Sequence, residues 1–252
     1  MATTHSDIGL DPGSVAVVTG AASGIGRASA VAFASHGARV ALVDINADGL
    51  RNTAKEIASR GGQTIQLIVD LANPDDVSSL VPAVVSEWGR LDYAHNNAGL
   101  SGLYHRVEEY DEETFDRILQ VNLLGVWRCL KHEITHMRQH SGGAIVNTSS
   151  IFGNVGMANN SAYTAAKHGV NGLTRSAALD GGAAGIRVNA VAPGPTDTGM
   201  LSPASQTLLQ RMPLGRRATP PEIGDVVVWL CSPAASFITG AVIPVDGGYL
   251  AS

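Results

Sequence analysis

The sequence predicts an α/β protein of the doubly wound, Rossmann-type class, with a seven-stranded parallel sheet flanked by helices on both faces. Three observations predict this class: short β-branched runs alternate with longer helical patterns, most of these runs lack polar alternation, and a glycine-rich turn follows the first run. The chain has 252 residues, of which 44% are hydrophobic and 15% charged, so it can form one large core.

The strand signals are short apolar runs bounded by turn residues. We expect strands at 15–19, 38–44, 64–70, 91–97, 144–150, 186–193 and 241–246. Helices are expected near 24–36, 47–60, 74–88, 111–139, 161–182 and 220–231. We expect a single domain over residues 13–252, preceded by a flexible segment at 1–12 and carrying a substrate loop near 195–219.

Composition argues against several classes of partner. The net charge of −5 leaves no basic surplus for binding nucleic acid. No apolar run approaches the roughly 20 residues that cross a membrane, and no signal or transit peptide pattern is visible, so we expect a cytoplasmic protein. Cys129 and Cys231 lie in apolar helical segments and are expected to be buried free thiols.

A glycine turn follows the first predicted strand. Gly20, Gly24 and Gly26 have the spacing GxxxGxG, with Ser23 and Ile25 beside the last two glycines, and a helix follows at once. Glycines allow a tight turn and close approach, and the free N–H groups of the helix start attract a diphosphate. The turn therefore predicts a nucleotide site, although a plain structural turn or a methyltransferase turn fits the same pattern.

The residue that ends the second predicted strand indicates which nucleotide is bound. Asp44 stands about 18 residues after Gly26, the spacing at which an acid meets the adenosine ribose. A 2′-phosphate about 4 Å from this carboxylate would be repelled by about 4 kcal/mol per charge pair at an effective dielectric of about 20. Ile45 supplies no compensating cation, so NAD is expected rather than NADP. The alternative is an acid that only caps the next helix.

A second acid ends the third predicted strand. Asp70, with the backbone of Leu71, either contacts the adenine or caps a turn.

Tyr163 and Lys167 are four residues apart, which places both side chains on one face of a helix. A phenol with a pKa near 10 needs roughly 4 kcal/mol of phenolate stabilisation to titrate near pH 7, which a close ammonium and a bound NAD cation would supply. Tyr and Lys are also ordinary on half-exposed helices, so the pair alone does not define a site.

Seven motifs occur in order along the chain: TGAASGIG at 19–26, NNAG at 96–99, Asn122 in the long helix, NTSS at 147–150, YTAAK at 163–167, PGPTDT at 193–198 and VDGG at 245–248. In this order they resemble the short-chain dehydrogenase/reductase family over nearly the whole chain. The resemblance implies that Tyr163 is the general acid and base, that Lys167 lowers the pKa of Tyr163 and binds the nicotinamide ribose, and that Ser150 holds the substrate oxygen. It also implies that Asn122 holds a water of a proton relay.

The same resemblance implies the rest of the cofactor site and a homotetramer. Besides Asp70 and Leu71, the implied NAD contacts are Gly20, Ser23, Gly24, Ile25, Gly26, Asp44, Ile45, Asn97, Ala98, Gly99, Tyr163, Lys167, Pro193, Gly194, Thr196 and Thr198, with Asn96 in the same segment. Subunit contacts are expected along the helices through Asn122 and Tyr163.

Two histidine patterns are interpreted as structural. His95 replaces an aliphatic residue before NNAG and is expected in the core or near the cofactor. His132, Glu133 and His136 spell HExxH, the zinc peptidase signature, but the extended motif fails because Gly142 stands at the position of its third histidine. We therefore expect no metal site.

The combined prediction is an NAD-dependent enzyme that interconverts a secondary alcohol and a ketone by direct hydride transfer. Its substrate is expected to be small or medium in size, cyclic or aryl, and bound by loops at 100–106, 152–160 and 196–218. The expected pocket residues are Leu100, Phe152, Val155, Met157, Met200, Leu201, Asn154 and Asn159. The alternatives are a 3-oxoacyl thioester reductase and a non-catalytic NAD-binding scaffold.

Overall fold

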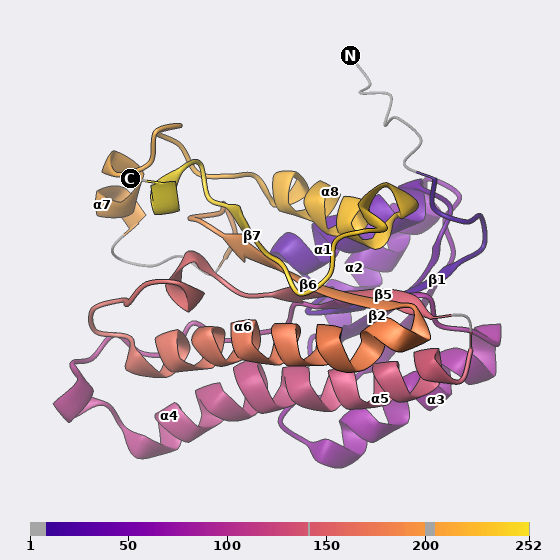
Figure 1. Ribbon diagram of the computed structural model, residues 1–252, viewed down its shortest axis with the longest axis horizontal. Coiled ribbons are helices and arrows are strands. Elements are labelled where there is room, and N and C mark those ends of the chain that lie inside the picture. The colour runs from indigo at the N-terminus through magenta and orange to yellow at the C-terminus, as the bar shows by residue number, and fades with distance from the viewer. Residues whose placement is uncertain (1–8, 141, 200–204, 252) are drawn as a thin grey trace.

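The computed structural model describes residues 9–140, 142–199 and 205–251, and within these ranges seven parallel strands form one sheet (Figure 1). The strands are β1 Val15–Thr19, β2 Arg39–Asp44, β3 Thr64–Ile68, β4 Tyr93–Asn96, β5 Gly143–Thr148, β6 Ile186–Pro193 and β7 Val242–Val245. Their order is β3-β2-β1-β4-β5-β6-β7. Successive strands are therefore added toward one edge of the sheet from β1 to β3 and toward the other edge from β4 to β7. The predicted fold class is confirmed.

The helices occupy the predicted positions, with one addition. They are α1 Gly24–Ser35, α2 Ala47–Ala58, α3 Pro74–Trp88, α4 Glu112–Leu119, α5 Val126–Arg138, α6 Ser161–Gly181, α7 Ser205–Gln210 and α8 Pro220–Cys231. The single helix expected at 111–139 is α4 and α5 joined by a π-helical turn at Gln120–Gly125. The addition is α7, which is only six residues long and lies in the expected substrate loop.

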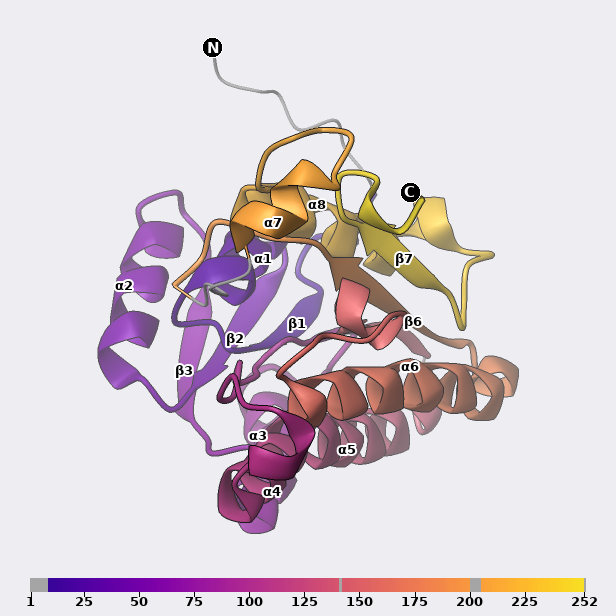
Figure 2. The same cartoon turned by 90° about the vertical axis from the view of Figure 1, so that its left-hand side faces the viewer.

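Helices cover both faces of the sheet: α1, α2 and α8 lie on one face, and α3, α5 and α6 lie on the other (Figure 2). Side chains of β1 alternate between the two cores, with Val15 and Val17 in one and Ala16 and Val18 in the other. Both faces of the strand are buried, in agreement with its apolar run from Val15 to Val18.

Several smaller predictions concern the rest of the chain. Residues 1–8 of the expected flexible segment lie outside the described residues, whereas Leu10 is 5% exposed and packs against the core of α1 and α8. Cys129 and Cys231 are buried free thiols, as predicted. No helix in the described ranges is both long and apolar enough to cross a membrane.

Candidate active site

A cavity of about 600 Å³ opens at the carboxyl ends of the strands, next to the neighbouring strands β1 and β4, between which the strand order reverses. Of the residues predicted to lie at the cofactor, all except Gly26 and Asn96 line it, and so does Ser150. Residues that the sequence analysis did not single out also line it: Thr19, Val43, Val69, Ser101, Tyr104, Arg117, Val121, Thr148, Ser149, Ile151, Asn160, Pro195, Gly199, Leu208 and Arg217. The predicted residues therefore meet at one edge of the sheet.

Gly26 does not line the cavity because its role is in the packing of the glycine turn. A Cβ at this position would lie 2.1 Å from the carbonyl oxygen of Gly20, so no side chain fits. Gly20 itself has a φ of 70°, in the left-handed region that favours glycine. The turn can therefore fold tightly against the start of α1 and leave the helix N–H groups facing the cavity.

Thr19 joins this turn to the segment after β4. Its hydroxyl accepts hydrogen bonds from the backbone N–H groups of Asn97, at 2.9 Å, and Ala98, at 3.0 Å. The Asn97 side chain donates back to the Thr19 carbonyl at 3.1 Å. Asn96, in contrast, is turned away from the cavity and donates to Glu133 and Asn147, so its expected place beside the cofactor is wrong.

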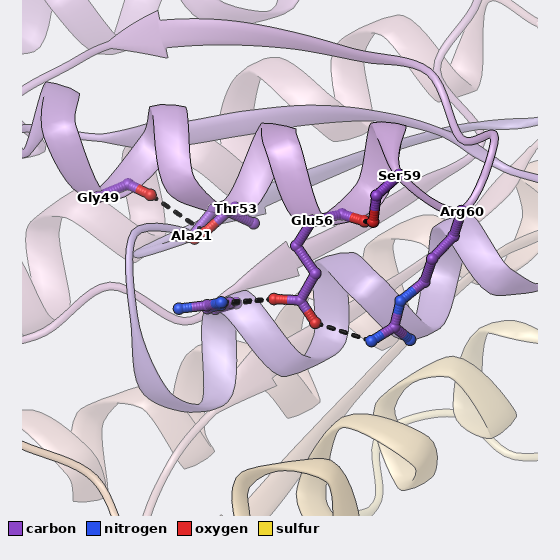
Figure 3. Close-up of polar contacts among 7 residues, drawn as sticks. Ala21, Gly49, Thr53, Glu56, Ser59 and Arg60 are labelled. Atoms are coloured by element: carbon purple, nitrogen blue, oxygen red, sulfur yellow. Dashed lines mark hydrogen bonds and ion pairs between the residues drawn. The ribbon is translucent and has the colours of Figure 1, made fainter. Parts of the chain in front are cut away.

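The glycine turn is also held from the side of α2. Thr53 is fully buried and donates a hydrogen bond of 2.8 Å to the carbonyl of Ala21, within the turn (Figure 3). One turn further along α2, Glu56 binds Arg60 at the surface (Figure 3). The Thr53 hydroxyl thus holds the glycine turn in place, a contact that the sequence of the turn itself does not predict.

Asp44 ends β2 directly beside the glycine turn. One carboxylate oxygen accepts from the N–H of Ala22 at 3.1 Å, and the other accepts from the N–H of Asn46 at 3.0 Å. Ile45 next to it is 63% exposed and lines the cavity. The carboxylate is therefore fixed at the cavity wall by two backbone groups.

Asp70 lies at the cavity wall and caps a turn, the second of its two expected roles. It lines the cavity and accepts from the N–H of Ala72 at 2.9 Å. It also pairs with Arg117 of α4 at 3.0 Å, a contact that the sequence did not predict. Burial works to raise the pKa of Asp70, but the bonds from Ala72 and Arg117 outweigh it and hold the pKa below its usual value.

Ser150, Tyr163 and Lys167 converge on one wall of the cavity. The hydroxyl of Ser150 lies close enough to the phenol of Tyr163 to act on its pKa. Lys167 lies one helical turn beyond Tyr163, with its ammonium 5.6 Å from the centre of the phenol ring. Ser149 also lines the cavity, but its hydroxyl donates to the Lys167 carbonyl at 3.3 Å.

The electrostatics of this group differ from the expectation. Burial raises the pKa of Tyr163, and the hydrogen bond with Ser150 acts in the opposite direction. Burial lowers the pKa of Lys167 to about 8. The Lys167 ammonium donates to the carbonyl of Thr148 at 2.7 Å, so it is directed at the backbone rather than at the phenol oxygen. The protein's own groups therefore raise rather than lower the pKa of Tyr163.

Asn122 lies in the π-helical turn and is fully buried behind the cavity wall. Its amide donates to the carbonyl of Leu100 at 2.8 Å and accepts from the N–H of the same residue at 2.8 Å. These two bonds fix the backbone just after Gly99, where the chain leaves the end of β4. The side chain thus supports the wall of the site and does not line it.

The segment after β6 forms the opposite wall. Pro193, Gly194, Thr196 and Thr198, which were expected to contact the cofactor, line the cavity. The additional hydroxyl of Thr196 donates to the carbonyl of Gly194 at 3.0 Å, so it stabilises the loop itself. Thr198 also approaches the glycine turn, because a Cβ on Gly24 would lie 3.1 Å from its methyl group. The two walls thus meet at the glycine turn.

The substrate end of the cavity matches the expected loops but only some of the expected side chains. Leu100, Phe152 and Met157 line it. Val155, Asn154 and Asn159 do not line it, and Met200 and Leu201 lie outside the described residues. Asn160, Tyr104 and Leu208 line it instead. Sequence alone located the loops, but it could not show which of their side chains turn inward.

His95 and the residues of the HExxH segment make packing and hydrogen-bond contacts within the fold. His95 is fully buried, its Nε2 lies 2.8 Å from the Thr148 hydroxyl, and burial lowers its pKa to about 3, so the ring is neutral. In the HExxH segment, Glu133 is buried against Asn96, whereas His136 stacks on His140 with ring centres 4.0 Å apart. In the described part of the chain, no three metal-ligating side chains of His, Cys, Asp or Glu gather.

Comparisons with known proteins agree with this arrangement. A family model described as enoyl-(acyl carrier protein) reductase matches residues 20–250. Cis-4-hydroxycyclohexanecarboxylate dehydrogenase of Sinomonas cyclohexanicum is 44% identical over 241 residues, which cover 94% of this chain and 96% of that protein. Cyclohexanol dehydrogenase of Acinetobacter sp. (strain SE19) is 40% identical over 236 residues, covering 93% and 94% of the two chains.

Solved structures are similar over the same length. The crystal structure of levodione reductase superposes with a TM-score of 0.94 at 35% identity, covering 96% of this chain and 100% of that one. The structure of NAD⁺-bound xylitol dehydrogenase gives a TM-score of 0.90 at 32% identity, covering 94% and 99%.

Proposed function

The chain belongs to the short-chain dehydrogenase/reductase family, and from this premise we propose that it oxidises secondary alcohols on small carbon rings with NAD, using Ser150, Tyr163 and Lys167. The family resemblance of the motifs is confirmed. The chain is an oxidoreductase of secondary alcohols and ketones, so it is an enzyme rather than a non-catalytic scaffold. The observation that carries the proposal is the convergence of these three side chains on the wall of one cavity.

The family and the similarity to an NAD⁺-bound enzyme indicate a nicotinamide cofactor, and the residues of this cavity fit one. The glycine turn leaves no room for a side chain at Gly26, and the start of α1 faces the opening. A diphosphate at this point would meet free helix N–H groups. The adenosine ribose of the cofactor would then lie beside the carboxylate of Asp44.

Asp44 supports NAD over NADP. Its carboxylate is held by the N–H groups of Ala22 and Asn46, so it cannot swing away from a ribose that carries a 2′-phosphate. The repulsion would be about 4 kcal/mol per charge pair at about 4 Å and an effective dielectric of about 20. The adjacent Ile45 offers no charge to offset it.

The chemistry of the proposed reaction follows from the three converging groups. The Ser150 hydroxyl would bind the alcohol oxygen, and Tyr163, as its phenolate, would take the hydroxyl proton and become the neutral phenol as the carbonyl forms. Burial alone raises the pKa of Tyr163, so the positive charge of Lys167, one turn away, would favour the phenolate only together with the positive charge of bound NAD. Bound NAD supplies the acceptor for the hydride. In the reverse direction Tyr163 returns the proton to the ketone oxygen.

The cavity walls support a compact ring substrate. Phe152, Met157 and Leu208 are apolar and lie at the substrate end. Two similar proteins are named for substrates with a six-membered carbon ring, cyclohexanol and cis-4-hydroxycyclohexanecarboxylate. We therefore propose a cyclohexanol-like alcohol as the substrate class. Reduction of a 3-oxoacyl thioester is the competing reaction.

We also propose that the chain forms a homotetramer through α5 and α6. Large apolar side chains are exposed on these helices, with Trp127 at 46% and Leu179 at 85%. Analytical ultracentrifugation tests this assembly, and a monomer at micromolar concentration would contradict it.

The proposed reaction is tested by following nicotinamide absorbance with the purified protein. Cyclohexanol and cis-4-hydroxycyclohexanecarboxylate are each oxidised with NAD and with NADP, and a 3-oxoacyl thioester is offered with each reduced cofactor. We expect turnover of ring alcohols with a higher kcat/KM for NAD. Activity confined to the thioester, or a preference for NADP, would overturn the proposal.

A further inference from the structure

Tyr104 is a polar side chain at the substrate end of the cavity that the proposed chemistry does not use. It lies in the connection between β4 and α4, is half-buried, and lines the cavity with Ser101. Within the described part of the chain, its hydroxyl has no hydrogen-bond partner. Because a phenol hydroxyl both donates and accepts, such a group in a binding cavity favours a polar atom of a ligand.

The backbone that carries Tyr104 is fixed on three sides. Asn122 binds both backbone groups of Leu100 at 2.8 Å. Asn160, at the start of α6, donates to the carbonyl of Ser101 at 2.7 Å. On the other side, the hydroxyl of Tyr110 accepts from the N–H of Leu103 at 3.2 Å. The position of Tyr104 is thus set in part by α6, the helix that carries the catalytic tyrosine.

Tyr104 also lies near the reacting end of the cavity. It lines the same cavity as Tyr163, and Asn160 joins the two segments, because it donates to the carbonyl of Ser101 and accepts from the N–H of Tyr163. The neighbouring walls are apolar, formed by Phe152, Met157 and Leu208. A ring held between these walls, with its reacting oxygen at Tyr163 and Ser150, would therefore have one further polar group within reach.

We propose that Tyr104 is a specificity-determining residue whose hydroxyl binds a second oxygen on the substrate ring. The preferred substrates are then cyclic alcohols that carry another hydroxyl or ketone oxygen away from the reacting carbon. This inference rests on the proposed ring-alcohol oxidation and narrows it to a subclass. A lone ring alcohol would leave the phenol hydroxyl without a substrate partner and bind less well.

The test compares cyclohexanol with the separate cis and trans isomers of cyclohexane-1,4-diol, with NAD as cofactor. The chains compared are the unaltered protein, Tyr104→Phe and Tyr110→Phe. Tyr110→Phe is a matched control because it removes a phenol hydroxyl that holds the same loop but does not line the cavity. The quantity of interest is the ratio of kcat/KM for a diol to kcat/KM for cyclohexanol.

We expect the unaltered protein to favour at least one diol isomer, and Tyr104→Phe to lower that ratio roughly three- to tenfold. The change should appear mainly in KM for the diol, because the contact is remote from the reacting oxygen. Tyr110→Phe should affect all of the alcohols in parallel and leave the ratio in place. An unaltered protein without diol preference, or equal ratios in Tyr104→Phe and the unaltered chain, would overturn the inference. Failure of the unaltered protein to oxidise any ring alcohol would instead contradict the proposed function on which it rests.

Discussion

The buried carboxylate of Glu133 accepts a hydrogen bond of 3.0 Å from the side-chain amide of Asn96, between α5 and the sheet. The same amide donates to Asn147 at 3.1 Å, and Asn147 donates to Thr174 at 3.0 Å, so a polar chain crosses from α5 to α6. Within the described part of the chain, the second oxygen of Glu133 and the oxygen of Asn96 have no hydrogen-bond partner. A charge on Glu133 is therefore poorly compensated.

Glu133→Gln is expected to stabilise the protein at alkaline pH. Burial raises the pKa of Glu133 to about 7, above its usual 4.5, so the folded chain keeps a proton that the unfolded chain releases. The free energy of unfolding should then fall as pH rises from about 4.5 to about 7, in total by about 3 kcal/mol. Glutamine cannot ionise, so the variant avoids this loss while its amide oxygen still accepts from Asn96.

Urea unfolding at pH 5 and pH 8 measures this effect. The two chains should be similar at pH 5, and the variant should be more stable at pH 8. Glu56→Gln serves as a control because Glu56 is paired with Arg27 and Arg60 near the surface, and it should give no gain at pH 8. Equal pH dependence in the Glu133 variant and the unaltered chain would show that Glu133 does not titrate in this way.

Thr53→Val is expected to loosen the glycine turn. Valine has the shape of threonine but lacks the hydroxyl that donates to Ala21, so a buried carbonyl loses its partner. We expect a loss of about 1–2 kcal/mol in the free energy of unfolding and a three- to tenfold weaker NAD affinity. Thr53→Ser keeps the hydroxyl and should restore most of the affinity in a calorimetric titration. If serine and valine weaken NAD binding equally, the anchor is not the hydroxyl.

Thr53 also shows where prediction from sequence ends. Asp44 and Tyr163 could be placed because local signals mark them: one ends a β-branched run, and the other is four residues before a lysine on a helix. Thr53 acts on a carbonyl 32 residues away, and Arg117 meets Asp70 across 47 residues, so their contacts exist only in the folded chain.

The loops show the same limit. The segments around the substrate could be located as the connections that follow strands, but whether Asn160 or Asn159 faces the cavity depends on how the turn before α6 is built. Asn159 takes a φ of 63° there, and Asn160 caps the helix by accepting from the N–H of Tyr163. A change of one residue in such a turn redirects the side chain, and composition does not specify it.

Tyr163→Phe is expected to remove the acid and base while leaving cofactor binding largely in place. The variant keeps the ring but lacks the hydroxyl next to Ser150, so kcat should fall by about a hundred- to ten-thousandfold. NAD affinity, measured by fluorescence titration, should change little. Undiminished turnover in the phenylalanine variant would refute the assignment of Tyr163.

Ser150→Ala should lose far more activity than Ser149→Ala, because the Ser149 hydroxyl is directed at the Lys167 carbonyl. Equal losses in the two alanine variants would contradict this assignment of Ser150.

Asp44→Asn is expected to relax the choice between the two dinucleotides. The asparagine oxygen can still accept from the N–H of Ala22, so the glycine turn keeps its support while the negative charge is removed. Because charge repulsion is the proposed reason for rejecting a 2′-phosphate, the ratio of kcat/KM for NADP to that for NAD should rise by about tenfold or more. Asp75→Asn, at the exposed first turn of α3 and outside the cavity, is the matched control and should leave the ratio unchanged. If the Asp44 variant discriminates as strongly as the unaltered chain, cofactor choice depends on shape and not on this charge.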